Sequence, residues 1–215
     1  MRFAFCLGLV LMTAVTGCSS TGVVSKEEEK VTIKDFPSRP RSERQTLAVI
    51  DFADKTGYGK GRIGTAAADI LINYLSESKQ FRVIERTQIA KVLQEHKLEQ
   101  SGITDAATAV KVGKLLNVKL LAYGTVTNFG MREESTEAII YQKKSQIAEC
   151  AVTVRLIDVA TGEILLSKMG DGKASREVKG SLGLGGRMSY DESLAGDSLR
   201  AAIAKFVDSM VESAY

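Results

Sequence analysis

The stretch 81–127 constrains the fold of this chain more than any other part of it. It begins with a short run of β-favouring residues at 81–84, after which the apolar residues Ile89, Val92 and Leu93 recur at helical spacing. Because the period of the pattern changes within a few residues, the sequence predicts a strand followed at once by a helix.

A second helix and a second strand complete this stretch. Thr104 or Asp105 can cap the start of the helix, and Asn117 can end it in the left-handed conformation that asparagine tolerates. The apolar run 118–126 is too short and too rich in β-formers to be another helix, and it is typical of a buried central strand. Strand, two helices and strand predict the core of a layered α/β domain.

The remaining apolar patterns add elements on both sides of this core. A first strand is expected at 47–51, and a helix with one apolar stripe at about 63–79. Alternating residues at 147–158 and a turn before 164–167 predict a hairpin, and 198–213 has the pattern of an amphipathic helix. We therefore expect an α/β (α+β) fold with a mixed β-sheet and packed helices.

Composition limits the classes of function. With 215 residues, of which 44% are hydrophobic, the chain is long enough for one domain with a substantial core. A net charge of +3 is too small to argue for a nucleic-acid partner. The chain has three cysteines, Cys6, Cys18 and Cys150, and Cys6 lies in the expected leader. The mature chain therefore has too few cysteines for a disulfide framework.

The N-terminus predicts a lipoprotein. Arg2 precedes an apolar stretch at 3–16, which is shorter than the roughly 20 residues of a membrane-spanning helix, so residues 1–17 are expected to be a signal peptide. Residues 15–18, Val-Thr-Gly-Cys, resemble the bacterial lipobox, in which cleavage occurs before a lipid-carrying cysteine. Cys18 is therefore the expected lipidation site. The alternative is a cysteine that lies near an ordinary cleavage site by coincidence.

The lipidated N-terminus is expected to continue as a tether. Ser19 stands where an Asp would commonly retain a lipoprotein in the inner membrane, which favours the outer membrane. Residues 18–45 are polar and charged and contain Pro37 and Pro40. Fully extended, such a segment could reach up to about 90 Å. The folded domain is expected at 46–215.

A glycine motif precedes the expected helix at about 63–79. Residues 59–64 match G-x-G-x-x-G, and Glu85 ends the next strand, which is the spacing of a dinucleotide-binding fingerprint. However, Gly59 lies well past the end of the first strand at Asp51, and the later strands form hairpins instead of further βαβ units. We expect a glycine-bearing loop, and no cofactor.

The sequence offers little that could support catalysis. His96 is the single histidine and lies among charged residues on an expected helix, and Cys150 begins a strand without a partner cysteine. No run of residues has metal-ligand spacing. We expect no catalytic residue, no metal ligand and no enzymatic activity.

Two stretches, 128–149 and 168–189, are long for connections within a compact domain. Each has 22 residues, enough for a transmembrane β-hairpin with strands of about 9–11 residues. In the second stretch apolar residues share even positions and polar residues share odd ones, as in a barrel wall. The candidate lipid-facing residues there are Val178, Leu182, Leu184 and Met188.

The first stretch has a less regular pattern. Phe129, Met131 and Ile147 share a parity, but so do the charged Glu133 and Glu149. A charge that faces lipid near the midplane costs about 2–4 kcal/mol for a basic residue and less for an acid. The alternative for both stretches is an extended hairpin in water or a disordered excursion.

Five segments of the domain, together with the lipobox-like residues, resemble one family, the curli production assembly/transport family of outer-membrane secretion channels. The resemblance covers nearly the whole mature chain and includes no catalytic motif. The segments are TLAVIDFADKTG at 46–57, FRVIERTQIAKVLQEHKLEQSG at 81–102, KLLNVKLLAYGTVTNF at 114–129, VTVRLIDVATGEIL at 152–165 and SLRAAIAKFVDSMV at 198–211.

This resemblance implies a periplasmic α/β domain that assembles into a homo-oligomeric ring. Each subunit would lend β-hairpins to one shared transmembrane β-barrel, through which unfolded fibre or adhesin polypeptides diffuse without nucleotide hydrolysis. The family's constriction is formed by the loop after the first strand, here 54–62, so Tyr58, Gly59 and Lys60 are candidate constriction residues. Tyr58 is the only aromatic residue in that loop.

Two functions follow from the sequence. The leading hypothesis is a lipid-anchored subunit of an outer-membrane export channel, with other copies of itself, membrane lipid, an unfolded secreted polypeptide and a periplasmic accessory protein as partners. The second is a periplasmic adaptor or activator lipoprotein that forms no pore, because similar α/β lipoproteins act in that way.

Overall fold

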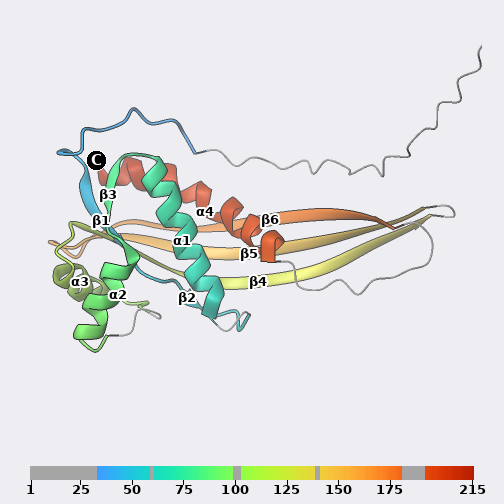
Figure 1. Cartoon of the computed structure of the whole chain (residues 1–215), viewed down its shortest axis with the longest axis horizontal. Coiled ribbons are helices and arrows are strands. Elements are labelled where there is room, and N and C mark those ends of the chain that lie inside the picture. Colours follow the sequence, from blue (N-terminus) through green and yellow to red (C-terminus); the bar gives the residue numbers. More distant parts are fainter. Residues whose placement is uncertain (1–32, 59–60, 99–102, 139–140, 181–191) are drawn as a thin grey trace, which may run out of the picture.

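The computed structural model of the chain describes residues 33–58, 61–98, 103–138, 141–180 and 192–215. These residues form one mixed sheet between two layers of helices (Figure 1). The predicted fold class, a mixed sheet with packed helices, is confirmed.

Within the described residues the sheet has six strands, in the order β3-β1-β4-β5-β6, with β2 beside β4. β1 pairs in parallel with β3 and β4, whereas β4, β5 and β6 are antiparallel neighbours. Along the chain the strands are β1 (Gln45–Val49), β2 (Ala53–Asp54), β3 (Phe81–Val83), β4 (Leu120–Ala138), β5 (Tyr141–Asp158) and β6 (Ile164–Gly180).

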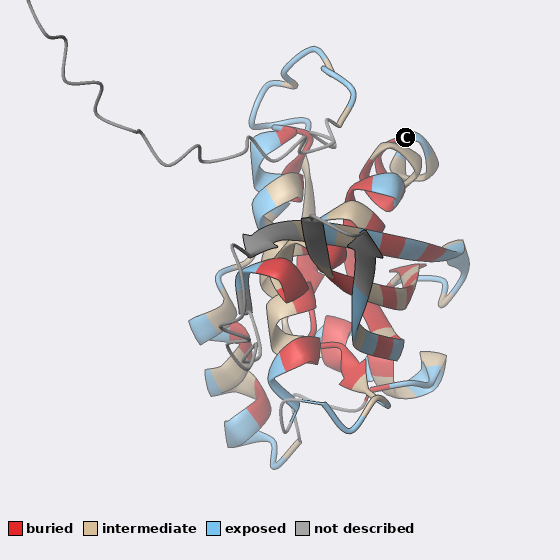
Figure 2. Ribbon diagram, turned by 90° about the vertical axis from the view of Figure 1, so that its right-hand side faces the viewer, coloured by how far each residue is buried: buried red, intermediate tan, exposed pale blue. Residues whose placement is uncertain are grey.

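Helices cover both faces of the sheet. α1 (Arg62–Glu77) and α4 (Glu192–Ala214) pack on one face, and α2 (Arg86–Glu95) and α3 (Ala106–Leu115) pack on the other. Figure 2 shows the buried residues concentrated between the sheet and these helices. The helix that was expected at 198–213 is the C-terminal part of α4, which begins earlier, at Glu192.

The first strand illustrates why this chain forms three layers. Leu47 and Val49 belong to the core under α1 and α4, whereas Ala48 and Ile50 belong to the core under α2 and α3. All four side chains are almost fully buried. A parallel strand that is covered on both faces is a continuous apolar run instead of an alternating one.

The order of elements predicted for 81–127 is confirmed as β3, α2, α3 and β4. Asp105 caps α3, because its carboxylate accepts a hydrogen bond from the backbone N–H of Thr108 at 2.8 Å. This hydrogen bond lowers the pKa of Asp105. Asn117 ends the helix with a φ of 50°, in the left-handed region.

The three antiparallel strands are much longer than predicted. β4, β5 and β6 contain 19, 18 and 17 residues, which at about 3.4 Å per residue correspond to roughly 60 Å. They leave the α/β domain together as an extended sheet (Figure 1). We call the extended part, residues 127–138, 141–151 and 168–180, the ribbon.

The N-terminal side of the domain also differs from expectation. Residues 18–45 were expected to be a tether, but residues 33–44 lie against the domain, and Ile33 and Phe36 pack on the core beneath α4. The backbone N–H of Lys34 donates a hydrogen bond to Asp208 in α4. Residues 18–32, including Cys18, lie outside the described residues.

Candidate functional site

The ribbon contains the first candidate hairpin. Residues 128–138 continue β4 and 141–149 begin β5, and the two strands pair up to Ala138 and Tyr141. The stretch 128–149 is thus the far end of one long hairpin.

The second candidate hairpin, 168–189, has a different arrangement. Its described part, 168–180, is a single strand that pairs with β5 along its length. Val178 lies in this strand, with its backbone opposite Lys144. The other candidate lipid-facing residues, Leu182, Leu184 and Met188, lie outside the described residues.

A β-bulge at the root of the ribbon changes which residues of β4 share a face. Val126 pairs with Val152 and Asn128 with Ala151, so Thr127 is an extra residue in β4. Because of this insertion, Phe129 lies on the same side as Val126, in the core beneath α4.

The pairing of β4 with β5 corrects the expected parity of the first hairpin. Met131 pairs with Ala148, and Arg132 pairs with Ile147. Since cross-strand partners share a face, Ile147 and its neighbour Glu149 do not lie on the face of Met131. The parity changes because this register pairs each odd-numbered residue of one strand with an even-numbered residue of the other, as Ala138 with Tyr141.

One face of the ribbon, which we call the covered face, lies against α4. A Cβ added to Gly172 would lie 1.9 Å from the carbonyl oxygen of Ser198, and one added to Gly170 would lie 2.8 Å from the ring of Phe206. Farther along β6, the guanidinium of Arg176 donates a hydrogen bond to the hydroxyl of Ser193 at 2.7 Å. Ala174, which the alternation assigned to an outward apolar face, shares a face of β6 with these three residues and therefore lies on the side that α4 covers.

The opposite face of the ribbon, which we call the open face, carries a ladder of charges. Arg132 of β4 is 2.6 Å from Glu149 of β5, and Lys173 of β6 is 3.4 Å from the same carboxylate. Arg132 also pairs with Glu134 at 3.2 Å. The hydrogen bond from Arg132, followed by that from Lys173, holds the pKa of Glu149 below its usual range. Each strand thus contributes to one cross-strand network.

The loop after β2 lies at the root of the ribbon. Asp54 accepts hydrogen bonds from the N–H and the hydroxyl of Thr56, and that hydroxyl accepts one from the N–H of Tyr58. The ring of Tyr58 is 38% exposed and lies edge-on to Phe129, with a centroid distance of 4.9 Å. The other candidate constriction residues, Gly59 and Lys60, lie outside the described residues.

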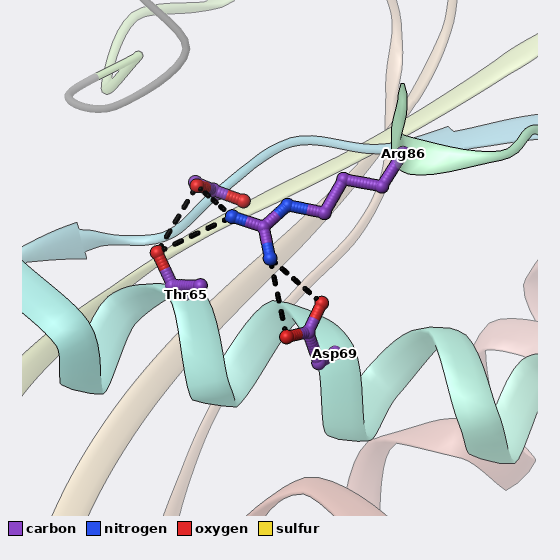
Figure 3. A network of polar contacts seen from close by, with 4 residues as sticks. Thr65, Asp69 and Arg86 are labelled. Atoms are coloured by element: carbon purple, nitrogen blue, oxygen red, sulfur yellow. Dashed lines mark hydrogen bonds and ion pairs between the residues drawn. The ribbon is translucent and has the colours of Figure 1, made fainter. Parts of the chain in front are cut away.

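A polar network occupies the carboxyl ends of β1 and β3 (Figure 3). Arg86, at the start of α2, donates to the carboxylate of Asp51 at 2.7 Å and to both oxygens of Asp69 at 3.0 and 3.1 Å. Thr65 also donates to Asp51, at 3.1 Å. This edge of a parallel sheet is where α/β folds place ligands. Here the protein's own guanidinium occupies it.

The order of elements in the sequence contains a signal for this network. Asp51 directly follows the first strand, and Arg86 follows the next one. Adjacent parallel strands end at the same edge of a sheet, so these two side chains could have been expected to meet.

Two glycines of the G-x-G-x-x-G motif have structural roles. Gly61 precedes α1 with a φ of 84°, a conformation that other residues rarely adopt. A Cβ on Gly64 would lie 2.0 Å from the carbonyl oxygen of Phe52, so only glycine lets α1 approach the end of β1 this closely. Gly59 lies outside the described residues.

The described residues also include a cysteine and side chains of the types that bind metals. Cys150 is buried, and burial raises the pKa of its thiol. In the described part of the chain, no group of three or more His, Cys, Asp or Glu side chains could hold a metal ion. Among the same residues, no helix combines the length and the apolar character needed to cross a membrane.

Known proteins resemble this chain along most of its length. A Neisseria meningitidis serogroup B protein that is named as a lipoprotein is 31% identical over 213 residues, covering 93% of this chain and 89% of that protein. Two solved structures are similar in fold. Lipoprotein GNA1162 from Neisseria meningitidis has 16% identity and a TM-score of 0.46, over 78% of this chain and 96% of that one. The C-terminal domain of LpoB from Salmonella enterica has 17% identity and a TM-score of 0.42, over 59% and 81%.

The family match is equally extensive. Residues 29–215 match the family described as curli production assembly/transport component CsgG. This range contains the whole described domain, including the ribbon and the strands on which it is built. The chain therefore belongs to the CsgG family of curli production assembly/transport components.

Proposed function

We propose that this protein is a lipid-anchored subunit of an oligomeric outer-membrane secretion channel of the curli type. It would export an unfolded fibre or adhesin polypeptide by diffusion. The observation that carries this proposal is the ribbon, a three-stranded sheet that leaves the domain with helix-covered residues on one face and a ladder of charges on the other.

Membership of the CsgG family indicates a membrane-anchored lipoprotein that faces the periplasm, and it argues against an enzyme. In the proposed channel, Cys18 carries the lipid anchor. Each buried methylene of an acyl chain contributes about 0.8 kcal/mol, so several chains on one cysteine hold the protein stably at the membrane.

In the proposed ring, ribbons from several copies stand side by side. The open face, with Arg132, Glu149 and Lys173, lines the water-filled interior, because charges that face lipid are costly. Tyr58 lies where the ribbon begins and narrows the passage there. The exported polypeptide and a periplasmic accessory protein are the proposed partners besides lipid and further copies of the chain.

One observation favours the second function, an adaptor that forms no pore. α4 follows the ribbon as far as Arg176, and β6 continues for only four residues beyond it, to Gly180. A membrane-spanning strand needs about 9–11 residues. In a channel, the start of α4 must therefore leave the ribbon, or segment 181–191 must add to the wall. In an adaptor, the ribbon simply stays in water.

Cysteine labelling of intact cells separates the two functions. In the channel, the end of the ribbon reaches the outer surface, so an Ala138→Cys variant should react with a bulky maleimide that cannot cross the outer membrane. A Lys111→Cys variant on the exposed side of α3 is the control, and it should react only after the outer membrane is permeabilised. If Ala138→Cys behaves like Lys111→Cys, the ribbon remains in the periplasm, and the adaptor function replaces the channel.

A further inference from the structure

We infer that residues 33–44, which we call the strap, are a docked segment that sets the free length of the lipid tether and the point where it leaves the domain. The inference rests on the lipid anchor proposed for Cys18. The strap itself is defined by contacts within the described residues, in two groups that lie on α4 and at the start of β3.

The first group of contacts holds the start of the strap on α4. The backbone N–H of Lys34 donates to Asp208 at 3.0 Å, and the ammonium group of Lys34 donates to Glu212 at 2.8 Å. On either side of Lys34, the side chains of Ile33 and Phe36 pack against the apolar core. The strap thus enters the domain with apolar as well as charged contacts.

The second group of contacts surrounds Gln80, which is only 2% exposed. Its amide nitrogen donates to the carbonyl oxygen of Pro37 at 2.9 Å, and its amide oxygen accepts from Arg39 at 2.9 Å. A buried amide is costly unless both of its ends are hydrogen-bonded. The strap supplies hydrogen bonds to both ends of the Gln80 side chain, so the buried position of Gln80 favours the docked strap.

The C-terminal residue completes this second group. The guanidinium of Arg39 lies 3.6 Å above the ring of Tyr215. The hydroxyl of Tyr215 donates to the carbonyl oxygen of Gln80 at 2.7 Å and accepts from the N–H of Gln45 at 3.1 Å. Arg39 thus lies between the buried amide and the end of the chain, and it contacts both.

Docking the strap shortens the reach of the anchor. The segment from Cys18 to Ile33 spans at most about 50 Å, whereas the segment from Cys18 to Gln45 would span up to about 90 Å if the strap were free. Lys168 of β6 bonds Ser209, next to the attachment point at Asp208. From residue 168 to the end of β6 is about 40 Å. With the strap docked, the lipid can therefore reach a bilayer at any point along the ribbon up to its end, and a free strap would add up to about 40 Å to this reach.

The docking is tested by a distance within the protein. Spin labels on the exposed positions of an Asp35→Cys/Lys205→Cys variant should give a short, narrow distance distribution in the purified full-length protein, because both positions lie near the Lys34 contact. Adding Arg39→Gln should broaden this distribution and shift it to longer distances. Arg41→Gln, an equal loss of charge at an exposed position of the same strap, is the matched control and should leave the distribution unchanged.

The length of the tether is tested on vesicles. The lipidated protein carries a donor dye at Lys205→Cys, and the vesicles contain acceptor-labelled phospholipid. Energy transfer should fall with Arg39→Gln and not with Arg41→Gln. Circular dichroism confirms that each variant is folded, and Gln80→Ala provides a second way to release the strap.

The outcomes separate this inference from the proposed function. A broad distance distribution in the unmodified strap, or equal energy transfer in all variants, would overturn the inference while leaving the channel in place. A protein that carries no lipid would overturn the anchor and the inference together. The strap is supported, whether or not the ribbon forms a pore, by two results together. These are a narrow distance distribution in the protein with Arg39 and lower energy transfer in the Arg39→Gln variant.

Discussion

Gly170 and Gly172 let α4 lie directly on the ribbon, because neither residue has a side chain. In the sequence they occupy the even positions of an alternating segment, where a glycine fits an apolar face and a polar face equally well. The backbone of Ser198 fills the place that a Cβ of Gly172 would need. The alternation that begins at Ala174 was therefore visible from the sequence, but the helix that covers one side of β6 was not.

The close approach at Gly172 predicts a large effect of one methyl group. Gly172→Ala should lower the free energy of unfolding by about 1–3 kcal/mol, as overpacking of a core does. Gly130→Ala is the matched control, since a Cβ there has nothing within 4 Å, and its effect should stay within about 0.5 kcal/mol. Urea denaturation measures both, and equal stabilities would contradict the packing of α4 on β6.

The network at Arg86 predicts a second effect on stability. Arg86→Met removes donors from Asp51, whose side chain is only 9% exposed, and should lower the free energy of unfolding by about 1–3 kcal/mol. Asp69→Asn changes the partner that is 49% exposed and should have a smaller effect. If thermal and urea denaturation rank the two variants in the opposite order, the carboxylate of Asp51 does not depend on Arg86.

At the scale of elements, local pattern predicted most of the fold. Apolar spacing placed β1, α1, β3, α2, α3 and the start of β4, because each of these elements buries its own side chains next to its sequence neighbours. The ends of the strands were not predicted, since they depend on pairing between residues far apart in the chain. The extra residue at Thr127 illustrates this, because one bulge changes the faces of every later residue in β4.

The open face of the ribbon predicts a pH dependence. Arg132 lowers the pKa of Glu149 from the ordinary 4.5, so the ladder is formed above that value and is lost as the pH falls through the lower, folded pKa. Arg132→Gln should raise the pKa of Glu149 toward 4.5, and carboxyl NMR titration measures the shift. Arg82→Gln, in the distant strand β3, is the matched control and should leave the pKa of Glu149 unchanged. An unchanged pKa in Arg132→Gln would mean that the two side chains do not pair in solution.

For the whole molecule, the sequence indicates the family, and the structure shows how segments that are distant in the chain meet. The family was readable in the sequence and is confirmed over residues 29–215, whereas the leader at 1–17 stays a prediction. The strap was not predicted, because residues 33–44, which are mostly polar, form contacts with Gln80, Asp208 and Tyr215, which are distant in the chain. Polar composition alone is equally typical of a free tether.

The position of Tyr58 at the start of the ribbon predicts how its substitution changes the conductance of the proposed channel. If its ring narrows the passage, Tyr58→Ala should raise the single-channel conductance of the detergent-extracted protein in planar bilayers. Tyr58→Phe keeps the ring and the edge-on contact with Phe129, so its conductance should stay close to that of the unmodified protein. Channels of equal conductance in all three proteins would place the constriction elsewhere.

In the proposed channel, several copies of this chain join their ribbons into one wall. Electron microscopy of the lipidated protein after extraction from outer membranes tests it most directly. We expect closed rings, each with a central opening and with the ribbons side by side around it. Particles of single, separate domains would contradict it.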